Sequence, residues 1–422
     1  MSSTGTAPPA LDADPAMYLA VHRALDEEVA DALMSDRDRE IRDRVRVVAA
    51  HEIAPGAADT DRTHDFAGPG YQALARAGLA GLLFPVRLGG SADSTVAYAA
   101  AVEEICAACP ATSLIYMTQT HAAYPILLAG GPGLARRYIP GLLDGSAYGS
   151  LAITEPDAGS DVSSLATGAR RNGDEYVING AKTFITTGDR AGVIICFATT
   201  DRSARRDGVS AFVVDGDAPG LTRGAPLSKM GMHGSSTAEL FLTDVRVPRA
   251  NRLGEEGGAW RIVMSAVIKS RISAAGQGVG IARGAYAHVL VELRRRHGAR
   301  LPSDIAARLA GMRGRILQAR LLLLATAAQV DRLDDGDDER PLPTGTIGMM
   351  KQQCTDVGVD IAAEAVGLLG ADGDRRDLGV ERYLRDALVT QIYDGTNDIQ
   401  RMLIARDTGT RLAAALDGRH TG

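Results

Sequence analysis

One carboxylate near the end of the chain stands where a side chain could do acid/base chemistry. Asp394 lies in the stretch QIYDGTNDIQR, between an aromatic residue and a Gly-Thr pair, just before a helical pattern begins. An Asp-Gly pair is common in tight turns, so Asp394 could be only a turn former. A turn also aims a side chain, and a desolvated carboxylate can abstract a proton near neutral pH. The motif therefore leaves two interpretations, a turn residue and a catalytic base.

Two other segments carry side chains suited to a flat, polar ligand. Residues 151–162, LAITEPDAGSDV, crowd hydroxyl, carboxylate and glycine residues into one turn, whose hydroxyls and N–H groups could hold a heterocycle and a phosphate. Residues 182–188, KTFITTG, place Phe184 among three threonines at the end of a strand pattern. That combination suits stacking on a ring system, although both segments are also typical of well-capped loops.

Other motifs have simpler explanations. Gly276, Gly278, Gly280 and Gly284 fall inside a helical pattern, where they predict close helix packing, and no G-x-G-x-x-G follows a strand. The C-x-x-C formed by Cys106 and Cys109 could be a redox pair or half a metal site, but its helical setting favours core packing. The eight His show no metal-ligand spacing, so we expect no metal.

The elements that must position these residues follow from the hydrophobic period. Helical spacing runs from 36 to about 143, with helices expected at 70–77, 94–109, 113–128 and 133–143. Short alternating runs fill 150–248, where Asn179-Gly180 predicts a hairpin turn. Helical spacing then returns near 258–296, 303–333, 346–369 and 395–416. We therefore predict a mainly α fold with a central β domain. Its parts are a partly disordered extension (1–35), a helical domain (36–149), an antiparallel β-barrel or sandwich (150–250) and a four-helix bundle (251–422).

Composition narrows the class of protein. Hydrophobic residues make up 45% of the chain and aromatics 4%, and the net charge is -6 without a basic cluster, which excludes a nucleic-acid partner. The longest apolar run, 321–330, is about half the ~20 residues that a membrane span needs. Because no positively charged start precedes an apolar stretch, no secretory signal is expected, and the location predicted is cytoplasmic.

Several motifs in this order resemble the acyl-CoA dehydrogenase family of FAD flavoproteins. They are TEPDAGSD, KTFITTG, KMG followed by SSTAEL, VPRANRLGEEG, RYLRDA and QIYDGTNDIQRMLIARD, and the similarity covers about 36–410. The resemblance implies FAD between the β domain and the bundle. It implies α,β-dehydrogenation of an acyl thioester, in which a base removes the α-proton and hydride passes from Cβ to flavin N5.

The resemblance also assigns residues. Those implied to bind FAD are Leu151, Ile153, Thr154, Ser160, Phe184, Thr186, Arg294 and Thr396. Ser160, Arg271, Asp394 and Gly395 are implied to meet the substrate. The largest subset of the family has Glu where this chain has Asp394, and the other position used by some members appears as Ser270. Asp394 is thus the base that the resemblance implies.

The departures from the family pattern bear on the substrate. Asp is shorter than Glu by roughly 1.5 Å, and within the family Asp is known in nitroalkane oxidases and in enzymes acting on carrier-protein-bound acyl groups. Ser303 and Gly367 replace two Gln that normally contact FAD across subunits. The substrate expected is an acyl-CoA or acyl-carrier protein, the electron acceptor an electron-transfer flavoprotein or O2, and the assembly a homo-oligomer. The alternatives are a nitroalkane-oxidase-like flavin oxidase or monooxygenase and a non-catalytic flavoprotein.

Overall fold

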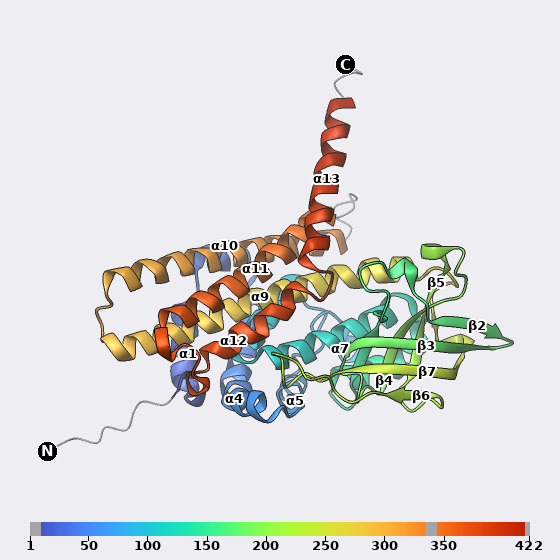
Figure 1. Ribbon diagram of the computed structural model, residues 1–422, viewed down its shortest axis with the longest axis horizontal. Helices are drawn as coiled ribbons and strands as arrows, with labels where there is room; N and C mark the ends of the chain where they lie inside the picture. Colours follow the sequence, from blue (N-terminus) through green and yellow to red (C-terminus); the bar gives the residue numbers. More distant parts are fainter. Residues whose placement is uncertain (1–9, 335–343, 418–422) are drawn as a thin grey trace.

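The chain folds as helices, then a sheet, then helices, in the order expected. The computed structural model describes residues 10–334 and 344–417, so the prediction of disorder at 1–9 lies outside the described residues. Figure 1 shows the sheet at one end of the long axis and the C-terminal helices extending from it. The predicted class, mainly α with a central β domain, is confirmed.

The N-terminal block is helical and begins earlier than expected. Its elements are η1 (Leu11–Ala13), α1 (Pro15–Ala24), α2 (Glu28–Asp31), α3 (Asp36–Val48), the π-helical η2 (Ala49–Ile53), α4 (Ala54–Thr63), α5 (Gly68–Arg76), η3 (Val86–Leu88), α6 (Thr95–Ala108), α7 (Pro110–Ala129) and α8 (Gly131–Leu143). Residues 10–15, expected to lack order, contain buried Leu11 and the Asp14 side chain that caps α1. Asp12 contacts Arg382 and His288, each at 3.1 Å, so charge pairing on distant helices fixes this segment.

Helices α6 and α7 form the centre of the helical core. Both are buried along almost their whole length and pack against the C-terminal helices. Cys106 and Cys109 are free and buried, and burial raises the pKa of both thiols. This agrees with the packing interpretation of the C-x-x-C. Within residues 10–334 and 344–417, no group of three His, Cys, Asp or Glu could hold a metal ion.

The middle block is one sheet. Its strands are β1 (Gly149–Ala152), β2 (Gly168–Asn172), β3 (Glu175–Thr186), β4 (Val193–Thr199), β5 (Val209–Asp215), β6 (Leu221–Arg223), β7 (Thr237–Pro248) and β8 (Arg252–Leu253). The order is β6-β7-β3-β2-β4-β5-β8, and β1 pairs with β4. That last pair is parallel, which corrects the expectation of a wholly antiparallel domain. Residues 153–192 supply the long connection that a parallel pair needs.

The hairpin turn forms at Asn172-Gly173, whereas the prediction placed it at Asn179-Gly180. Asn172 pairs with Glu175 across a turn in which Gly173 has φ 64°. The Asn179-Gly180 pair lies inside β3, at a shift in register against β7. A Cβ at Gly180 would lie 2.4 Å from the Thr167 hydroxyl. The sequence RNGDEYVING holds two turn signals, and the longer pairing of β3 with β7 selects the first.

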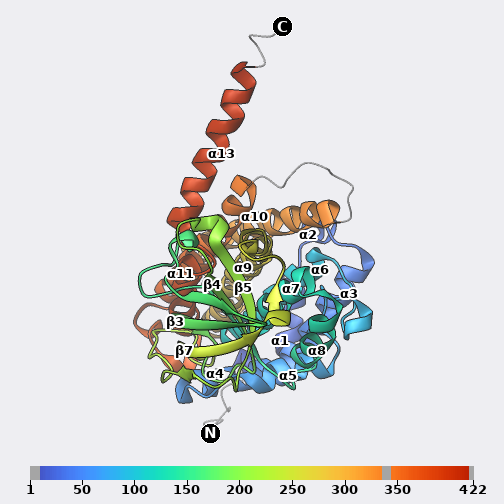
Figure 2. The same cartoon turned by 90° about the vertical axis from the view of Figure 1, so that its right-hand side faces the viewer.

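The C-terminal block consists of long helices joined by short links. It contains η6 (Arg249–Asn251), α9 (Ala259–His297), α10 (Ser303–Asp334), α11 (Thr344–Leu368), α12 (Val380–Ala387), η9 (Leu388–Gln391) and α13 (Asn397–Asp417). The four long helices were expected, but α12 was not, because eight residues show too little of a helical period. Figures 1 and 2 show α13 standing away from the rest of the molecule, and residues 408–416 are exposed.

Glycines bring α9 close to its neighbours, as predicted. A Cβ at Gly278 would lie 2.3 Å from the Cys354 carbonyl oxygen on α11. At Gly280 and Gly284, a Cβ would lie 2.5 Å and 2.7 Å from carbonyl oxygens of α6. These distances leave no space for a side chain, so α6, α9 and α11 form one rigid unit. No helix of the described ranges is long and apolar enough to cross a membrane.

Candidate active site at the Asp394 turn

The turn that carries Asp394 has an unusual backbone conformation. Asp394 and Gly395 have φ angles of 56° and 86°. Both lie in the left-handed region, which residues other than glycine rarely adopt. The Gln400 side chain donates to the Gly395 carbonyl at 2.9 Å, and Thr396 accepts the Ile399 N–H at 3.3 Å. The start of α13 thus holds the strained turn in place. A strained residue fixed in this way is typical of a functional site.

The Asp394 carboxylate is desolvated and incompletely bonded. Its Oδ2 atom is buried and has no hydrogen-bond partner, although the residue as a whole is half-buried. Burial raises the pKa of Asp394 to about 6, against the opposing effects of Lys351, Ser270 and Arg271. The group therefore changes protonation close to neutral pH. A carboxylate in this state can accept a proton from a weak carbon acid.

Two buried cations face the carboxylate without pairing to it. Arg271 is 7% exposed, its Nε atom has no partner, and burial lowers its pKa to about 10. Lys351 is fully buried, and burial lowers its pKa to about 8 while Asp394 acts in the opposite direction. The Arg271 guanidinium lies 3.6 Å from the place where a Cβ on Gly395 would be. The base therefore lies beside two buried positive charges.

Helix α11 holds the other side of the turn. Lys351 donates to the Asn397 side-chain oxygen at 2.8 Å. The Asn397 amide in turn donates to Thr355 at 2.9 Å and to Asp356 at 2.7 Å. Sequence reasoning missed this network because Lys351 and Asn397 are 46 residues apart. The only signal was the position of Asn397, directly after the Gly-Thr pair of the predicted motif.

Polar contacts on α9 and α7 join these helices to each other and to the sheet. Ser270 donates to the Val267 carbonyl oxygen at 3.1 Å and precedes Arg271 on α9. One turn later, Ser273 contacts His121 on α7 at 3.2 Å. Gln119, also on α7, accepts the Gly149 N–H of β1 at 2.7 Å. Helices α9 and α7 thus place β1 beside the region of the candidate base.

The two segments predicted to line a flavin lie against each other. The Ser150 hydroxyl donates to the Thr186 carbonyl at 2.8 Å, and the Thr183 N–H donates to the Thr154 carbonyl at 2.9 Å. Leu151, Ile153, Thr154 and Thr186 are all half-buried. The structure therefore brings these four residues together near the C-terminal ends of β1 and β3, which we call the β1–β3 edge.

A buried ion pair holds the loop that carries Ser160. Lys182 donates to Glu155 at 2.7 Å and to the Ile153 carbonyl at 3.0 Å. Glu155 also accepts the Thr167 N–H at 3.0 Å, which closes the loop. Ser160 lies exposed within it. The pair was not identified from the sequence, although both residues lie in the quoted motifs.

Phe184 has the features of a stacking residue. Its side chain is 67% exposed, and its φ is 55°. An exposed aromatic ring held in a strained conformation is costly unless a ligand covers it. Arg294 lies elsewhere, near the far end of α9 and exposed, about 35 Å along the helix from Arg271. Within one chain, Arg294 is therefore not part of the Asp394 site.

Comparison with known proteins accounts for most of the chain. The family models for the N-terminal, middle and C-terminal domains of acyl-CoA dehydrogenase match residues 35–146, 150–245 and 257–409. Cyclohex-1-ene-1-carbonyl-CoA dehydrogenase of Syntrophus aciditrophicus is 36% identical over 378 residues, which cover 88% of this chain and 90% of the relative.

Solved structures agree with this result. Butyryl-CoA dehydrogenase from Megasphaera elsdenii superposes with a TM-score of 0.83 at 32% identity, covering 90% of this chain and 99% of the other. The prolyl acyl carrier protein oxidase AnaB superposes with a TM-score of 0.83 at 28% identity, covering 89% and 99%. The chain belongs to the acyl-CoA dehydrogenase family and is an oxidoreductase acting on CH–CH groups.

Proposed function

We propose that the protein is an FAD-dependent enzyme that introduces an α,β double bond into an acyl thioester, with Asp394 as the base. The observation that carries the proposal is the Asp394 carboxylate, which is buried, lacks a partner at Oδ2 and has a pKa of about 6. The carboxylate removes the proton from Cα, and the hydride leaves Cβ. At the end of the reaction Asp394 holds the proton and passes it to solvent.

The α-proton of a thioester is weakly acidic, so the thioester oxygen must be stabilised as negative charge develops on it. Within the described residues, the backbone N–H of Asp394 donates to no acceptor. It is available to donate to that oxygen, as donors do in other enolate-forming sites. Gly395 and the buried Arg271 line the same place, and the Arg271 charge adds to the stabilisation. Ser160 is the fourth residue that we assign to the substrate.

The residues of the β1–β3 edge fit a flavin. The exposed ring of Phe184 offers a stacking face, and the adjoining Leu151, Ile153, Thr154 and Thr186 offer apolar and hydrogen-bonding groups. Thr396 at the start of α13 and Ser160 are assigned to the same cofactor. When bound, FAD supplies the acceptor for the hydride. Arg294, remote within its own chain, is assigned to the cofactor of a neighbouring copy in a homo-oligomer.

Substrates can be separated by anaerobic mixing. The purified protein is mixed with acyl-CoAs, acyl-carrier proteins and nitroalkanes while the flavin absorbance is followed. Bleaching by a thioester that persists until an artificial acceptor is added supports the proposal. Bleaching by a nitroalkane with rapid reoxidation in air identifies an oxidase instead. A protein that holds FAD but is bleached by no member of the panel contradicts the proposed activity.

Carrier-protein-bound thioesters have a specific reason to be in the panel. Asp394 replaces the longer Glu that most of the family uses, and AnaB, which superposes over 89% of this chain, is described as acting on a prolyl acyl carrier protein. A base that is shorter by one methylene requires its substrate to sit closer to the turn. An acyl-carrier protein substrate is therefore our second candidate beside acyl-CoA. The ratio of the two bleaching rates decides between them.

A further inference from the structure

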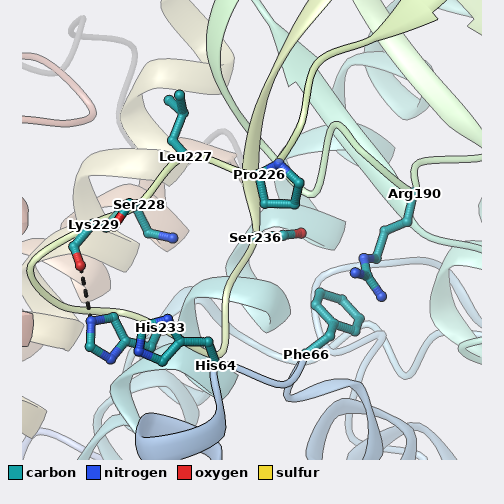
Figure 3. Close-up of a pocket in the computed structure, with 9 residues that line it drawn as sticks. All are labelled: His64, Phe66, Arg190, Pro226, Leu227, Ser228, Lys229, His233 and Ser236. Atoms are coloured by element: carbon teal, nitrogen blue, oxygen red, sulfur yellow. Dashed lines mark hydrogen bonds between the residues drawn. The ribbon is translucent and has the colours of Figure 1, made fainter.

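A cavity lies outside the Asp394 site. Its volume is about 240 Å³, and its walls come from the loop after α4, the turn between β3 and β4, and the connection between β6 and β7. Figure 3 shows the residues that line it. None of them is assigned above to the cofactor or the substrate. By volume the cavity could hold about eight water molecules, so it is large enough for a small organic ligand.

The cavity wall is cationic. Arg190 lies over the Phe66 ring, with its guanidinium carbon 4.1 Å from the ring centroid, and Lys229 is a second lining cation. Of the nine lining residues, none is acidic. The nearest carboxylates are already engaged: Asp189 pairs with Arg190 and accepts the Ser236 hydroxyl, and Asp61 pairs with Arg385. Lys229 in turn donates to the Ser235 carbonyl oxygen at 2.7 Å. Arg190 has five N–H donors and Lys229 three, so each cation keeps N–H groups beyond these contacts.

His233 is held beside the cavity by contacts at both ring nitrogens. Its Nδ1 atom lies 2.9 Å from the Asp61 carbonyl oxygen and 3.0 Å from the Asp61 carboxylate. Its Nε2 atom lies 2.9 Å from the Lys229 carbonyl oxygen, a contact drawn in Figure 3. Both ring nitrogens thus lie next to backbone carbonyl oxygens, which fix the orientation of the ring. His64 stacks on this ring with centroids 3.9 Å apart.

The cavity is built from fixed pieces. His64 and Met232 have φ of 63° and 53°, so the backbone at two sides of the cavity holds strained conformations. A Cβ at Gly234 would lie 2.3 Å from a methyl group of Thr60, which shows how closely the β6–β7 connection packs on the end of α4. Strain maintained by close packing is characteristic of binding sites. The backbone at these two sides of the space is therefore fixed, which holds His64 and His233 at its wall.

We infer that this cavity binds a small phosphate ester. Arg190 and Lys229 supply the positive charge that an oxyanion needs. Phe66 is covered on one face by Arg190 and His64 on one face by His233, and both rings line the space where an organic group attached to the phosphate would lie. Ser236 accepts, through its carbonyl, the N–H of Thr187, the residue after Thr186. A ligand bound in the cavity would therefore affect the β1–β3 edge, which we assign to the flavin.

Titration calorimetry on the full-length protein, as purified, tests the inference. The probes are inorganic phosphate, adenosine 5′-monophosphate and adenosine. We expect saturable binding of the monophosphate, weaker binding of phosphate, and none of adenosine. Arg190→Gln should weaken monophosphate binding about tenfold, because a charged hydrogen bond is lost. The matched control is Arg246→Gln, an exposed arginine on β7 that pairs with Glu175 and should leave the affinity unchanged.

The outcomes separate this site from the phosphate-binding parts of the reaction site. Binding that is equal in the Arg190 and Arg246 variants places the ligand elsewhere and overturns the inference, as does an absence of saturable binding. Should Arg190→Gln unfold, Lys229→Gln removes the other lining cation and gives the same comparison. If phosphate binds as tightly as the monophosphate, the ligand is a free oxyanion and the ester assignment fails. None of these results depends on Asp394.

Discussion

Two groups of buried charges lie along α9 and differ in how completely they are paired. Around Arg283, the carboxylates of Glu103 and Glu104 are both within bonding distance, and Arg46 binds Glu104 at 2.7 Å. Around Arg271, about 18 Å along the helix, the buried charges of Lys351 and Asp394 form no ion pair with it or with each other in the described part of the chain.

The difference separates a structural cluster from a reactive one. A buried charge with a partner can contribute to folding, whereas a buried charge without one costs free energy. The ion pairs of the Arg283 cluster join α3, α6 and α9 and so hold the helical core together. The Asp394 group keeps its carboxylate unpaired and at a raised pKa. That cost is reasonable only where the carboxylate has a reaction to perform.

The largest effect should come from removing the base. Asp394→Asn keeps the shape of the turn but cannot accept a proton, and general-base catalysis typically contributes ~100- to 10,000-fold. We expect flavin reduction by the best thioester to slow about 1,000-fold with FAD retained, measured by anaerobic stopped flow. Asp394→Glu is the companion variant and should keep a measurable rate. An unchanged rate in Asp394→Asn would exclude Asp394 as the base.

Breaking the paired cluster should instead affect stability. Glu104→Gln removes the negative charge that Arg283 and Arg46 share, which leaves buried positive charge without a partner. Such changes typically lower the free energy of unfolding by about 3–5 kcal/mol. The free energy of unfolding is measured by urea denaturation. The exposed Arg37–Glu40 pair is the control, and Glu40→Gln should change stability by less than about 0.5 kcal/mol. Equal losses of stability in Glu104→Gln and Glu40→Gln would mean that the buried cluster contributes no more to folding than an exposed ion pair does.

The unpaired carboxylate predicts a specific dependence of stability on pH. The pKa of Asp394 is raised on folding, from 3.8 to about 6, so its contribution is present below the unfolded value and is lost as pH rises through the folded value. Relative to Asp394→Asn, the wild-type protein should therefore lose about 2.5 kcal/mol of stability between pH 4 and pH 8. Urea denaturation of both proteins at several pH values measures it. A constant difference would mean that the carboxylate is solvated.

Lys351 should tune the base by a smaller amount. Its positive charge lowers the pKa of Asp394, so Lys351→Met should raise that pKa and move the rising limb of the pH–rate profile upward by about one unit. The profile is measured from the initial rate of flavin reduction. Lys351→Arg keeps the charge and should keep the profile near that of the wild type. A lower rate without a shift in either variant would indicate only a packing role.

The sequence predicted the parts of the site that are local and missed those that depend on packing. Asp394, Phe184 and the paired β1 and β3 segments lie in short motifs that can be read directly. Lys351 and Asn397 meet only because α11 packs against the start of α13, and no local pattern encodes that contact. The roles assigned to the individual site residues remain predictions until the variants above are measured.

The errors in the fold have the same origin. Two Asn-Gly pairs offered equal turn signals, and the pairing of β3 with β7 across the sheet selected the first. The parallel β1–β4 pair likewise depends on strands 40 residues apart. The long helices were predicted well, since their apolar period extends over many turns. Helix α12 was missed because its eight residues show too little of that period.

The contact between Asp12 and Arg382 has a consequence for the order of folding. The two residues are 370 positions apart, so during synthesis the N-terminal segment emerges long before its partner exists. Closing a loop of that length carries a large entropic cost, and such contacts form late. The contact between Asp12 and Arg382 should therefore form only when α12 is in place, whereas Asp26 and Asp31 can already pair with Arg46 and Arg42 on α3. Protection of residues 11–13 from hydrogen exchange would then report that η1 has docked on the C-terminal helices.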